Sequence, residues 1–474
     1  MTIEQGPRER SPGMKLLLVS LIGFVLVIPL MLIYLLVYDR QDQSKTAQDA
    51  INAGWGGPQV VAGPVIVVPY KTTQVQNEQV DGKTVSRTVE VERQLFISPV
   101  ANTVETTVKP EERRKSIYRS VLYEADIRGK ARFALPADLA RFGVTREALL
   151  WDRAELRVGA SDARGLVKGG TLTVDGKPLG VEPGNGPAAT GGQGFFAFLT
   201  WNGEGAIAVD YAFGLRGSRS LSLVPRGGQT RWAVQSSWPS PSFGGAFLPE
   251  RPKVTEHGFK ASYTIDKLAL GQAPVDSSDA GPPAIDDGSG RTDTAYPVVA
   301  TAADGTQASS GPARAVTVGL VEPVNLYSKV ERSVKYGFLF IGFTFLTFLL
   351  FDVVGGARVA AAEYLLTGAG LVLFFVLLLA FSEVIGFTPA YLVASGAIIG
   401  LLSAYSAAVL KSWRRGRFIG AMLVGLYALL FVLLNLEAWS LLIGSVLLFA
   451  ALAGVMYATR KVDWGSVGQR EATA

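Results

Sequence analysis

Long apolar stretches occupy the two ends of the chain, and a polar region rich in turn-forming residues lies between them. Residues 16–38 contain no charged side chain, and five further apolar stretches follow later, at residues 334–354, 364–382, 389–410, 418–436 and 438–459. A membrane-crossing helix needs about 20 apolar residues, because each residue rises about 1.5 Å through a hydrocarbon layer of roughly 30 Å. The pattern predicts six spans in total, with residues 334–459 forming a five-helix transmembrane bundle.

The first apolar stretch is predicted to be an uncleaved signal anchor. Arg8, Arg10 and Lys15 precede it, within a tail of residues 1–15. A cleavable signal peptide has a shorter apolar region and a small-residue cleavage site, and neither feature is clear here. Residues 39–53 keep a charged, alanine-containing pattern that continues the helix, and Gly54 is predicted to end it.

After Gly54 the apolar positions change to the two-residue period of strands. Valine and isoleucine run through residues 59–70, and the dipeptides Asp81-Gly82 and Asp175-Gly176 are signals for β-hairpins. Many short strands between glycine-rich turns are typical of an antiparallel sandwich. The chain is therefore predicted to be an α+β membrane protein whose residues 39–333 form one large, antiparallel β-rich, sandwich-like domain.

One segment of this domain is predicted to be a mobile loop. Residues 271–311 are rich in Gly, Pro, Ser, Asp and Ala and contain few large apolar side chains. Such a composition supplies little to bury in a core.

The distribution of lysine and arginine predicts the orientation in the membrane. Basic residues gather in the tails and in alternate short loops, at Arg358, Lys411, Arg414, Arg415, Arg417, Arg460 and Lys461, and the two intervening short loops contain none. Cytoplasmic loops collect positive charge. Both termini, including the tail of residues 460–474, are predicted to be cytoplasmic, and residues 39–333 periplasmic.

Composition narrows the possible chemistry. The net charge is +5 without a basic block, so nucleic acid is not an expected partner. The absence of cysteine excludes a catalytic thiol, a cysteine-ligated zinc and an iron–sulfur cluster. The single histidine, His257, leaves little room for imidazole chemistry, and a surface histidine is favoured over a member of a hydrolase triad. We assign no catalytic, cofactor-binding or metal-binding residue.

Several stretches resemble the CreD family of inner-membrane cell-envelope integrity proteins. They are GGPQVVAGPVIVVPY at 56–70, SDARGL at 161–166, SSWPSPSFGGAFLP at 236–249, ERSVKYGFLFIGFTFLTFLLFD at 331–352, YLLTGAGLVLFFVLLLAFSEVIGF at 364–387 and TRKVDW at 459–464. Their order and spacing cover nearly the whole chain. The resemblance implies a bacterial inner-membrane protein with a role in envelope integrity, and it supplies no catalytic residue.

Glu383 is the candidate coupling residue. Four membrane acids, Asp352, Glu363, Glu383 and Glu437, lie at predicted span ends, where a carboxylate can stay hydrated. Glu383 ends a helix, where the negative end of the helix dipole disfavours its charge. We expect it to pair with Arg332 or Lys335 at the beginning of the second span; the alternative is a place on an ion or proton pathway.

Three hypotheses for function follow. The first is a non-enzymatic membrane protein that supports envelope integrity or the envelope-stress response through its periplasmic domain. Its partners would be the lipid bilayer and envelope components. The second is a transporter or channel that uses the bundle, and the third is a membrane-anchored periplasmic hydrolase.

Overall fold

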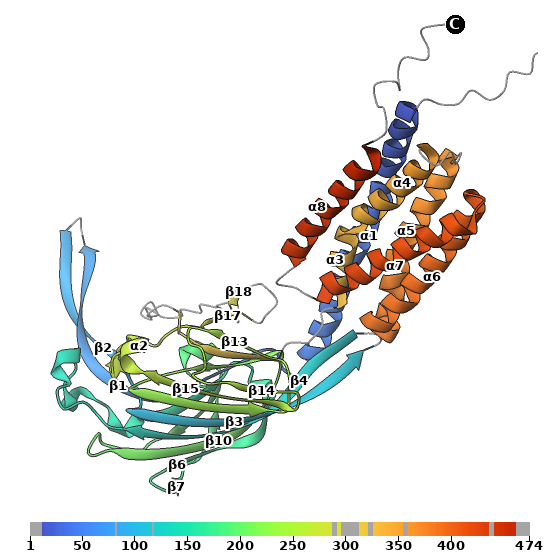
Figure 1. Cartoon of the computed structure of the whole chain (residues 1–474). Coiled ribbons are helices and arrows are strands. Elements are labelled where there is room, and N and C mark those ends of the chain that lie inside the picture. Colours follow the sequence, from blue (N-terminus) through green and yellow to red (C-terminus); the bar gives the residue numbers. More distant parts are fainter. Residues whose placement is uncertain are drawn as a thin grey trace, which may run out of the picture. The chain divides into compact units, whose positions relative to one another are not determined.

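The chain consists of two compact units in the computed structural model (Figure 1). One unit contains Met1–Lys45 and Val324–Ala474, and the other contains Thr46–Pro323. The structure describes residues 12–80, 83–115, 118–286, 292–294, 312–320, 326–353, 359–435 and 440–460. We refer to the two parts as the helical unit and the β unit.

A single helix, α1 (Pro12–Ala53), contributes its first part to the helical unit and its last two turns to the β unit. It ends as predicted at Gly54, where the amides of Trp55 and Gly56 donate to the Asn52 carbonyl over 3.0 and 2.8 Å. Backbone donors just past a helix satisfy carbonyls that have no partner inside it.

The helical unit continues with α3 (Leu326–Lys335), α4 (Gly337–Val353), α5 (Ala361–Ile385), α6 (Phe387–Val409), α7 (Trp413–Asn435) and α8 (Ser440–Thr459). Five helical segments in the described residues are long and apolar enough to cross a membrane: α1, α3 with α4, α5, α6 and α7. The sixth span, predicted where α8 lies, stays a prediction.

The second membrane segment begins earlier than predicted. A short helix, α3, precedes α4 and belongs to the helical unit, although residues 326–333 were expected in the external domain. It is amphipathic, with Tyr327, Val330 and Val334 buried along one face. The mixture of charged and apolar positions hid this helix from a search for uninterrupted apolar runs.

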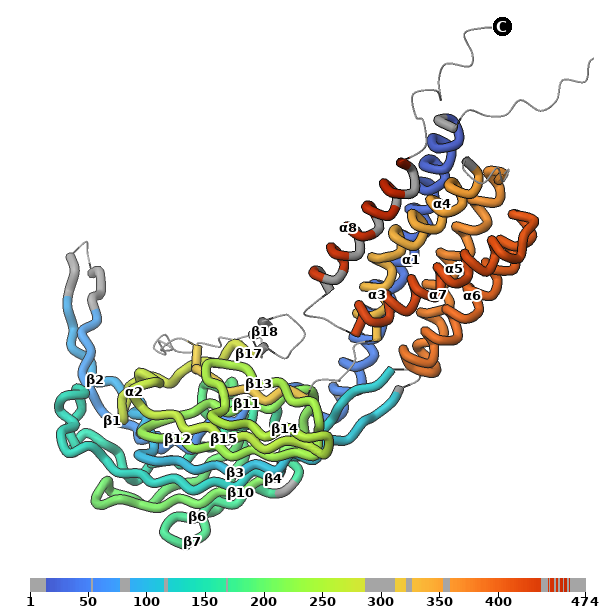
Figure 2. The backbone as a smooth tube through the Cα atoms, in the orientation of Figure 1, coloured from blue at the N-terminus to red at the C-terminus, as the bar shows by residue number. Residues whose placement is uncertain are grey.

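Two large sheets make up most of the β unit (Figure 2). In the first, the strands run β13 (Pro241–Gly245), β19 (Val316–Leu320), β11 (Ser220–Val224), β1 (Gln59–Val80), β5 (Glu155–Ala160), β9 (Gly194–Phe198) and β8 (Glu182–Pro183), with β2 (Lys83–Ile97) on β1 and β16 (Val275–Asp276) on β2. In the second they run β14 (Lys253–Thr255), β15 (Gly258–Asp266), β12 (Gln229–Ser236), β3 (Ala101–Lys115), β4 (Tyr118–Phe133), β10 (Ile207–Ser218), β6 (Leu166–Val174) and β7 (Lys177–Pro178). A third, small sheet pairs β17 (Ala284–Asp286) with β18 (Thr292–Thr294).

The two large sheets share one hydrophobic core. Ile66 and Leu156 from the first sheet and Tyr123 and Trp232 from the second belong to the same buried cluster. Along β12 and β15 buried and exposed residues alternate, as expected for strands with one face on a core. The sandwich-like architecture agrees with the prediction.

The prediction of a purely antiparallel domain is wrong at two places. β1 pairs with β11 in parallel, from Gln59↔Leu221 to Ala62↔Val224, and β3 pairs with β12 in parallel. Parallel neighbours need long connections between the strands, so local turn signals do not reveal them.

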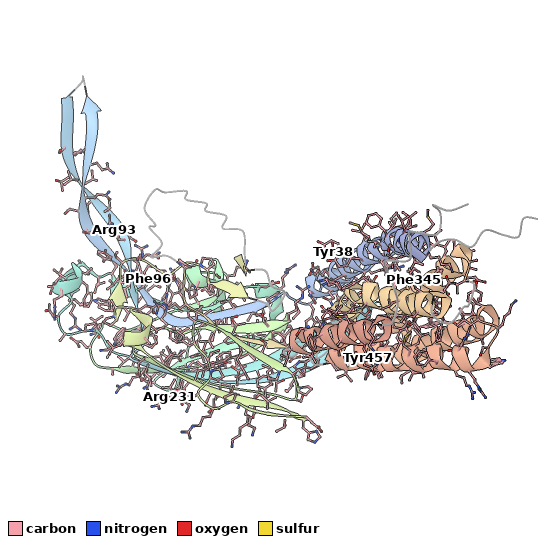
Figure 3. All side chains as sticks on the ribbon, turned by 45° about the horizontal axis from the view of Figure 1, so that its top comes forward. Tyr38, Arg93, Phe96, Arg231, Phe345 and Tyr457 are labelled. Carbon is pink, nitrogen blue, oxygen red and sulfur yellow. The ribbon has the colours of Figure 1, made fainter. Side chains whose placement is uncertain are left out.

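Both predicted hairpins are present. The β1–β2 ladder continues to the pair Val80↔Lys83, and Asp81-Gly82 itself lies outside the described residues. Asp175 and Gly176 join β6 to β7 with φ angles of 48° and 79°, which a type I′ hairpin turn requires. The outer half of the β1–β2 hairpin projects from the sheet, with Arg93 on the projecting arm and Phe96 at its base (Figure 3).

The expectation that residues 271–311 have little to bury is wrong for their first part. Val275 and Ile285 are 1% and 4% exposed, and β16 adds to the edge of β2. A few apolar side chains among many small polar ones are enough to fix a segment, and the average composition hides them. Residues 287–291 and 295–311 lie outside the described residues, so mobility there stays a prediction.

Candidate functional site

Glu383 lies at the end of α5 and accepts a hydrogen bond from a residue of α3. The Tyr327 hydroxyl donates to Glu383 Oε1 over 3.2 Å, and Tyr327 is 7% exposed. The Lys329 ammonium, also on α3, donates to Asn435 Oδ1 at the end of α7 over 3.0 Å and lies 5.4 Å from the ring centre of Phe387 in α6. One short helix therefore contacts the ends of three longer ones.

The two residues predicted to pair with Glu383, Arg332 and Lys335, make other contacts. Lys335 forms an ion pair of 2.7 Å with Glu331 on its own helix, and Tyr34 of α1 donates to the same carboxylate over 3.2 Å. The Arg332 Nε atom donates to the Ser328 carbonyl over 3.4 Å. The structure thus brings all three predicted residues to one end of the helical unit. Among the residues it describes, the hydroxyl of Tyr327 replaces the expected ion pair to Glu383.

Sequence reasoning missed both tyrosines. The signal that was present is the amphipathic spacing of Tyr327, Val330 and Val334, which places the tyrosine on the buried face of α3. Tyr34 had no such signal, because it lies inside an apolar run where every position looks alike.

A second polar contact joins α1 to α4 at the other end of the apolar stretch. Lys15 Nζ lies 2.9 Å from Asp352 Oδ1, and the aspartate side chain is only 2% exposed. The expectation that Asp352 stays hydrated is therefore wrong, since helix packing encloses it and the lysine compensates its charge. Lys15 and Tyr34 are separated by 19 residues, or about 28 Å of helix, close to the thickness of a bilayer core.

Glu363 follows the expectation more closely. Its Oε2 atom accepts the backbone amide of Ala360 over 2.8 Å at the start of α5. A carboxylate at a helix amino terminus satisfies a free amide and is favoured by the helix dipole. Glu437 lies outside the described residues.

Two of the stretches that carry the family resemblance meet in the β unit at Gln59. Its side-chain amide donates to the Arg216 carbonyl over 2.9 Å, and its Oε1 atom accepts from Ser161 Oγ and the Asp162 amide, both over 3.1 Å. Gln59 is fully buried, and a Cβ on Gly165 would come within 2.7 Å of its amide nitrogen. A satisfied, close-packed node of this kind fixes strand β1 to the turn before β6 and leaves no room for a ligand.

Asp162 also contacts Arg164 within the same stretch. Its carboxylate accepts from the Arg164 guanidinium over 2.8 and 2.9 Å. The hydrogen bond from Arg164 lowers the pKa of Asp162 below its ordinary value, against the opposing effect of burial. The ionised Asp162 carboxylate therefore has a structural role, in holding this turn through Arg164.

The last turns of α1 are fastened to the β unit. Ser120 Oγ donates to Asn52 Oδ1 over 2.7 Å in a buried contact, and Arg219 pairs with Asp49. The Trp55 ring lies between two guanidinium groups, with Arg113 at 3.9 Å and Arg216 at 4.3 Å from its centre. These contacts connect the last turns of α1 to strands β3, β4 and β10 of the second sheet.

A buried ion pair fixes the segment that follows β16. Arg226 pairs with Asp279, and their side chains are 6% and 5% exposed. The aspartate also accepts the backbone amide of Ala188 over 2.7 Å. Burial lowers the pKa of Arg226 to about 10. Breaking such a pair would leave an uncompensated charge in the interior, so the contact holds residues 279–286 against the sheet.

Two surface hollows in the described part of the β unit are each lined by a single carboxylate, Asp138 in one and Glu182 in the other, and by no histidine. The larger, about 600 Å³, lies between β6 and β9 and is lined mainly by glycine and apolar residues such as Leu166, Val181 and Phe195. The smaller, about 310 Å³, is lined by Leu135 to Ala140 and by Arg146. Among the described residues no cluster of three His, Asp or Glu side chains could hold a metal, and His257 is exposed in a turn.

These features define a class of protein: a helical membrane protein with a large β-sandwich unit inserted between its first and second membrane helices. Comparison with known proteins identifies the family. The family sequence model described as "Inner membrane protein CreD" matches residues 11–465. The Inner membrane protein CreD of Escherichia coli (strain K12) is 33% identical over 458 residues, which cover 94% of this chain and 92% of that protein. The chain belongs to the CreD family of inner membrane proteins.

Solved structures show only faint likeness to the chain. An M1 zinc metallopeptidase from Deinococcus radiodurans aligns with a TM-score of 0.22 and 7% identity, over 47% of this chain and 42% of the peptidase. A putative protease from Parabacteroides distasonis aligns with a TM-score of 0.17 and 9% identity, over 54% and 50% of the two chains. The chain spans half or less of these proteins, and scores this low carry no argument about fold or activity.

Proposed function

We propose that this protein supports cell-envelope integrity without catalysing a reaction, and that its β unit is the part that acts on the envelope. The observation that carries the proposal is the attachment of a large β unit to the end of a membrane helix, by a buried hydrogen bond at Asn52 and by the arginines that cover the half-buried Trp55. Such an attachment suits a domain held at a membrane surface. Membership of the CreD family supports the inner membrane as its place.

The proposed topology has six spans, with α8 as the last. Both termini are cytoplasmic, and residues 39–333 are periplasmic, because basic residues gather in the tails and in alternate loops. In this arrangement the β unit faces envelope components, which we propose as its partners together with the lipid bilayer.

The test is complementation in cells that lack the protein. The wild-type chain should restore resistance to detergents and to envelope-permeant dyes, whereas Asn52→Ala with Trp55→Ala should restore less at equal membrane abundance. Exposed substitutions such as Lys130→Ala, away from these contacts, serve as the matched control. Equal complementation by the double variant and the wild type would contradict the proposal, and crosslinking from the β unit in cells would identify the component it contacts.

A transporter or channel is the second candidate, and the buried Asp352 is the observation that favours it. An enclosed carboxylate in a membrane helix is often functional, although here Lys15 compensates it. The purified protein in vesicles should show no ion or proton flux if the first proposal is right. Flux that is abolished by Asp352→Asn or Glu383→Gln, with unchanged protease sensitivity, would move the transporter to first place.

A further inference from the structure

The β sandwich is open at one end, where the outermost strands of the two large sheets border the same hollow. β8 ends the first sheet, and β6 with the two-residue strand β7 ends the second, at the bottom of Figure 1. The larger of the two hollows, about 600 Å³, is lined by residues of β6 on one side and by residues 181–184 and 192–195 on the other. Among the strands that the structure describes, none joins the two sheets across this hollow.

The floor of the hollow is the hydrophobic core of the sandwich. Phe195 is 4% exposed and belongs to the core that the two sheets share, and the half-buried Leu166 and Val181 pack against it. A Cβ on Gly170 would come within 2.9 Å of the Phe195 ring, so this glycine lets the ring lie against β6. An apolar side chain that enters the hollow would therefore extend an existing core and leave water.

The backbone of β6 has a free outer edge beside the hollow. On its inner side β6 pairs with β10 along its whole length. On its outer side β7 pairs only with Thr173 and Val174, and the Leu172 carbonyl accepts the Leu179 amide over 2.8 Å. Residues 166–171 have no strand on that side within the described part of the chain. Unpaired backbone groups of this kind are a template for another strand, whose alternate side chains would face the hollow.

Two glycines mark the middle of this edge. The register of β6 against β10 shifts between Lys168 and Thr171, so the strand bulges at Gly169 and Gly170. A Cβ on Gly169 would meet nothing within 4 Å, and packing inside the protein therefore does not require a glycine at this position. Glycine within a strand is typical of a bulge or of a place where another backbone approaches closely. The bulge also limits the regular edge to a few residues, so it suits a short segment.

One carboxylate gives the hollow a charge. Glu182 lies in β8 at the border of the hollow and is exposed. It forms no ion pair with any residue that the structure describes, and no lysine or arginine is among the lining residues. A basic side chain of a bound partner would complement this charge.

We propose that this hollow binds a short extended segment of another polypeptide. The segment pairs with the free edge of β6, places an apolar side chain in the hollow and brings a lysine or arginine to Glu182. An extended peptide supplies backbone donors and acceptors together with side chains for a pocket, whereas an acyl chain would leave the strand edge unpaired. The inference names the kind of partner on which the β unit acts, and it rests on the proposed function for the place of that partner in the envelope.

Binding of synthetic peptides to the purified full-length protein tests the proposal. The probes are an array of fluorescein-labelled decapeptides with apolar residues at alternate positions and one lysine, and fluorescence anisotropy measures binding. The best peptide should lose binding when the amides of one edge are N-methylated, because the donors to β6 are then gone. Replacing its lysine by glutamine should weaken binding about two- to fivefold, as expected for an exposed ion pair.

Variants of the protein locate the site. Gly169→Trp should remove binding, because the indole occupies the open space at the bulge. Gly244→Trp is the matched control and should bind as the wild type does, since Gly244 is also a glycine of an edge strand, β13, where a Cβ meets nothing within 4 Å. Glu182→Lys should reverse the preference toward peptides that carry glutamate in place of lysine, and it tests the site even if the tryptophan variant does not fold.

Several outcomes would overturn the proposal. They are equal binding by the wild type and Gly169→Trp, equal binding of the N-methylated peptide, and an unchanged charge preference in Glu182→Lys. Binding of dodecanoate that Gly169→Trp removes, without binding of any peptide, would assign the hollow to an acyl chain instead. Peptide binding is measured on the purified protein and complementation in cells, so a failure of one is distinguishable from a failure of the other.

Discussion

The Tyr327 hydroxyl and the Glu383 carboxylate join α3 to the end of α5 across 56 residues of sequence, with 3.2 Å between their oxygen atoms. Removing the hydroxyl by Tyr327→Phe keeps the ring in place and deletes this bond. We expect the protein in detergent to lose about 1–2 kcal/mol of unfolding free energy, as for other hydrogen bonds to charged groups. Tyr336→Phe, on a half-buried tyrosine between α3 and α4, is the control. If both variants melt at the same temperature, the bond contributes nothing to stability.

The pair of Lys15 and Asp352 gives a prediction with two parts. Lys15→Met should destabilise the helical unit by about 3–5 kcal/mol, because it leaves the Asp352 carboxylate, whose side chain is 2% exposed, without its counter-ion. Lys15→Met combined with Asp352→Leu should cost much less, since both charges are gone. Thermal unfolding in detergent measures both, and a double variant no more stable than Lys15→Met would show that packing, not charge, dominates.

Asp279 should control the order of residues 279–286. Replacing it by alanine leaves Arg226 buried without its counter-ion, at a cost of about 3–5 kcal/mol. Hydrogen exchange should then increase in residues 279–286. Glu256→Ala, at an exposed acidic residue in the turn after β14, is the control. Unchanged exchange in the Asp279 variant would mean that Val275 and Ile285 alone hold the segment.

Asp162 predicts a pH dependence. Its pKa in the folded protein lies below the ordinary value because Arg164 stabilises the ionised form. The ionised carboxylate therefore contributes stability above about pH 4, and this contribution falls as the pH drops through the folded pKa. The difference in melting temperature between the wild type and Asp162→Asn should be largest near neutral pH and shrink below pH 4. A difference that grows on acidification would have the wrong sign.

Reporter fusions test the topology. A phosphatase that is active only outside the cytoplasm should be active when fused after Gly271. It should be inactive after Arg415 and after Ala474, because the basic loop before α7 and the carboxy terminus are predicted to be cytoplasmic. Activity at the carboxy terminus would mean an odd number of spans.

The parts of the fold that local patterns govern could be predicted. Apolar run length predicted the five membrane-length helical segments found among the described residues. Gly54 predicted the end of α1, and Asp175-Gly176 predicted a hairpin, which has the required φ angles. The parallel pairing of β1 with β11 could not be predicted, because about 160 residues separate the two strands and no local sequence signal indicates which distant strands pair. The same holds for the candidate site, where Glu383, Arg332 and Lys335 were brought to one end but Tyr327 makes the contact. The charges in the sequence suggested an ion pair to Glu383. The packing of α3 instead places the Tyr327 hydroxyl beside this carboxylate.

The place of β19 in its sheet has a consequence for synthesis at the ribosome. β19 is the last of the described strands of the β unit in sequence, yet it lies between β13 and β11 in the interior of the sheet. Until Val316 has been made, β11 and β13 each present an unpaired edge that can recruit foreign strands. The nascent chain therefore stays vulnerable to aggregation from the synthesis of β11 until that of β19, which is the last third of this unit, and is released from that risk only as α3 begins to appear. Chaperone dependence should rise for truncations that end just before Val316 and fall once Leu320 is included.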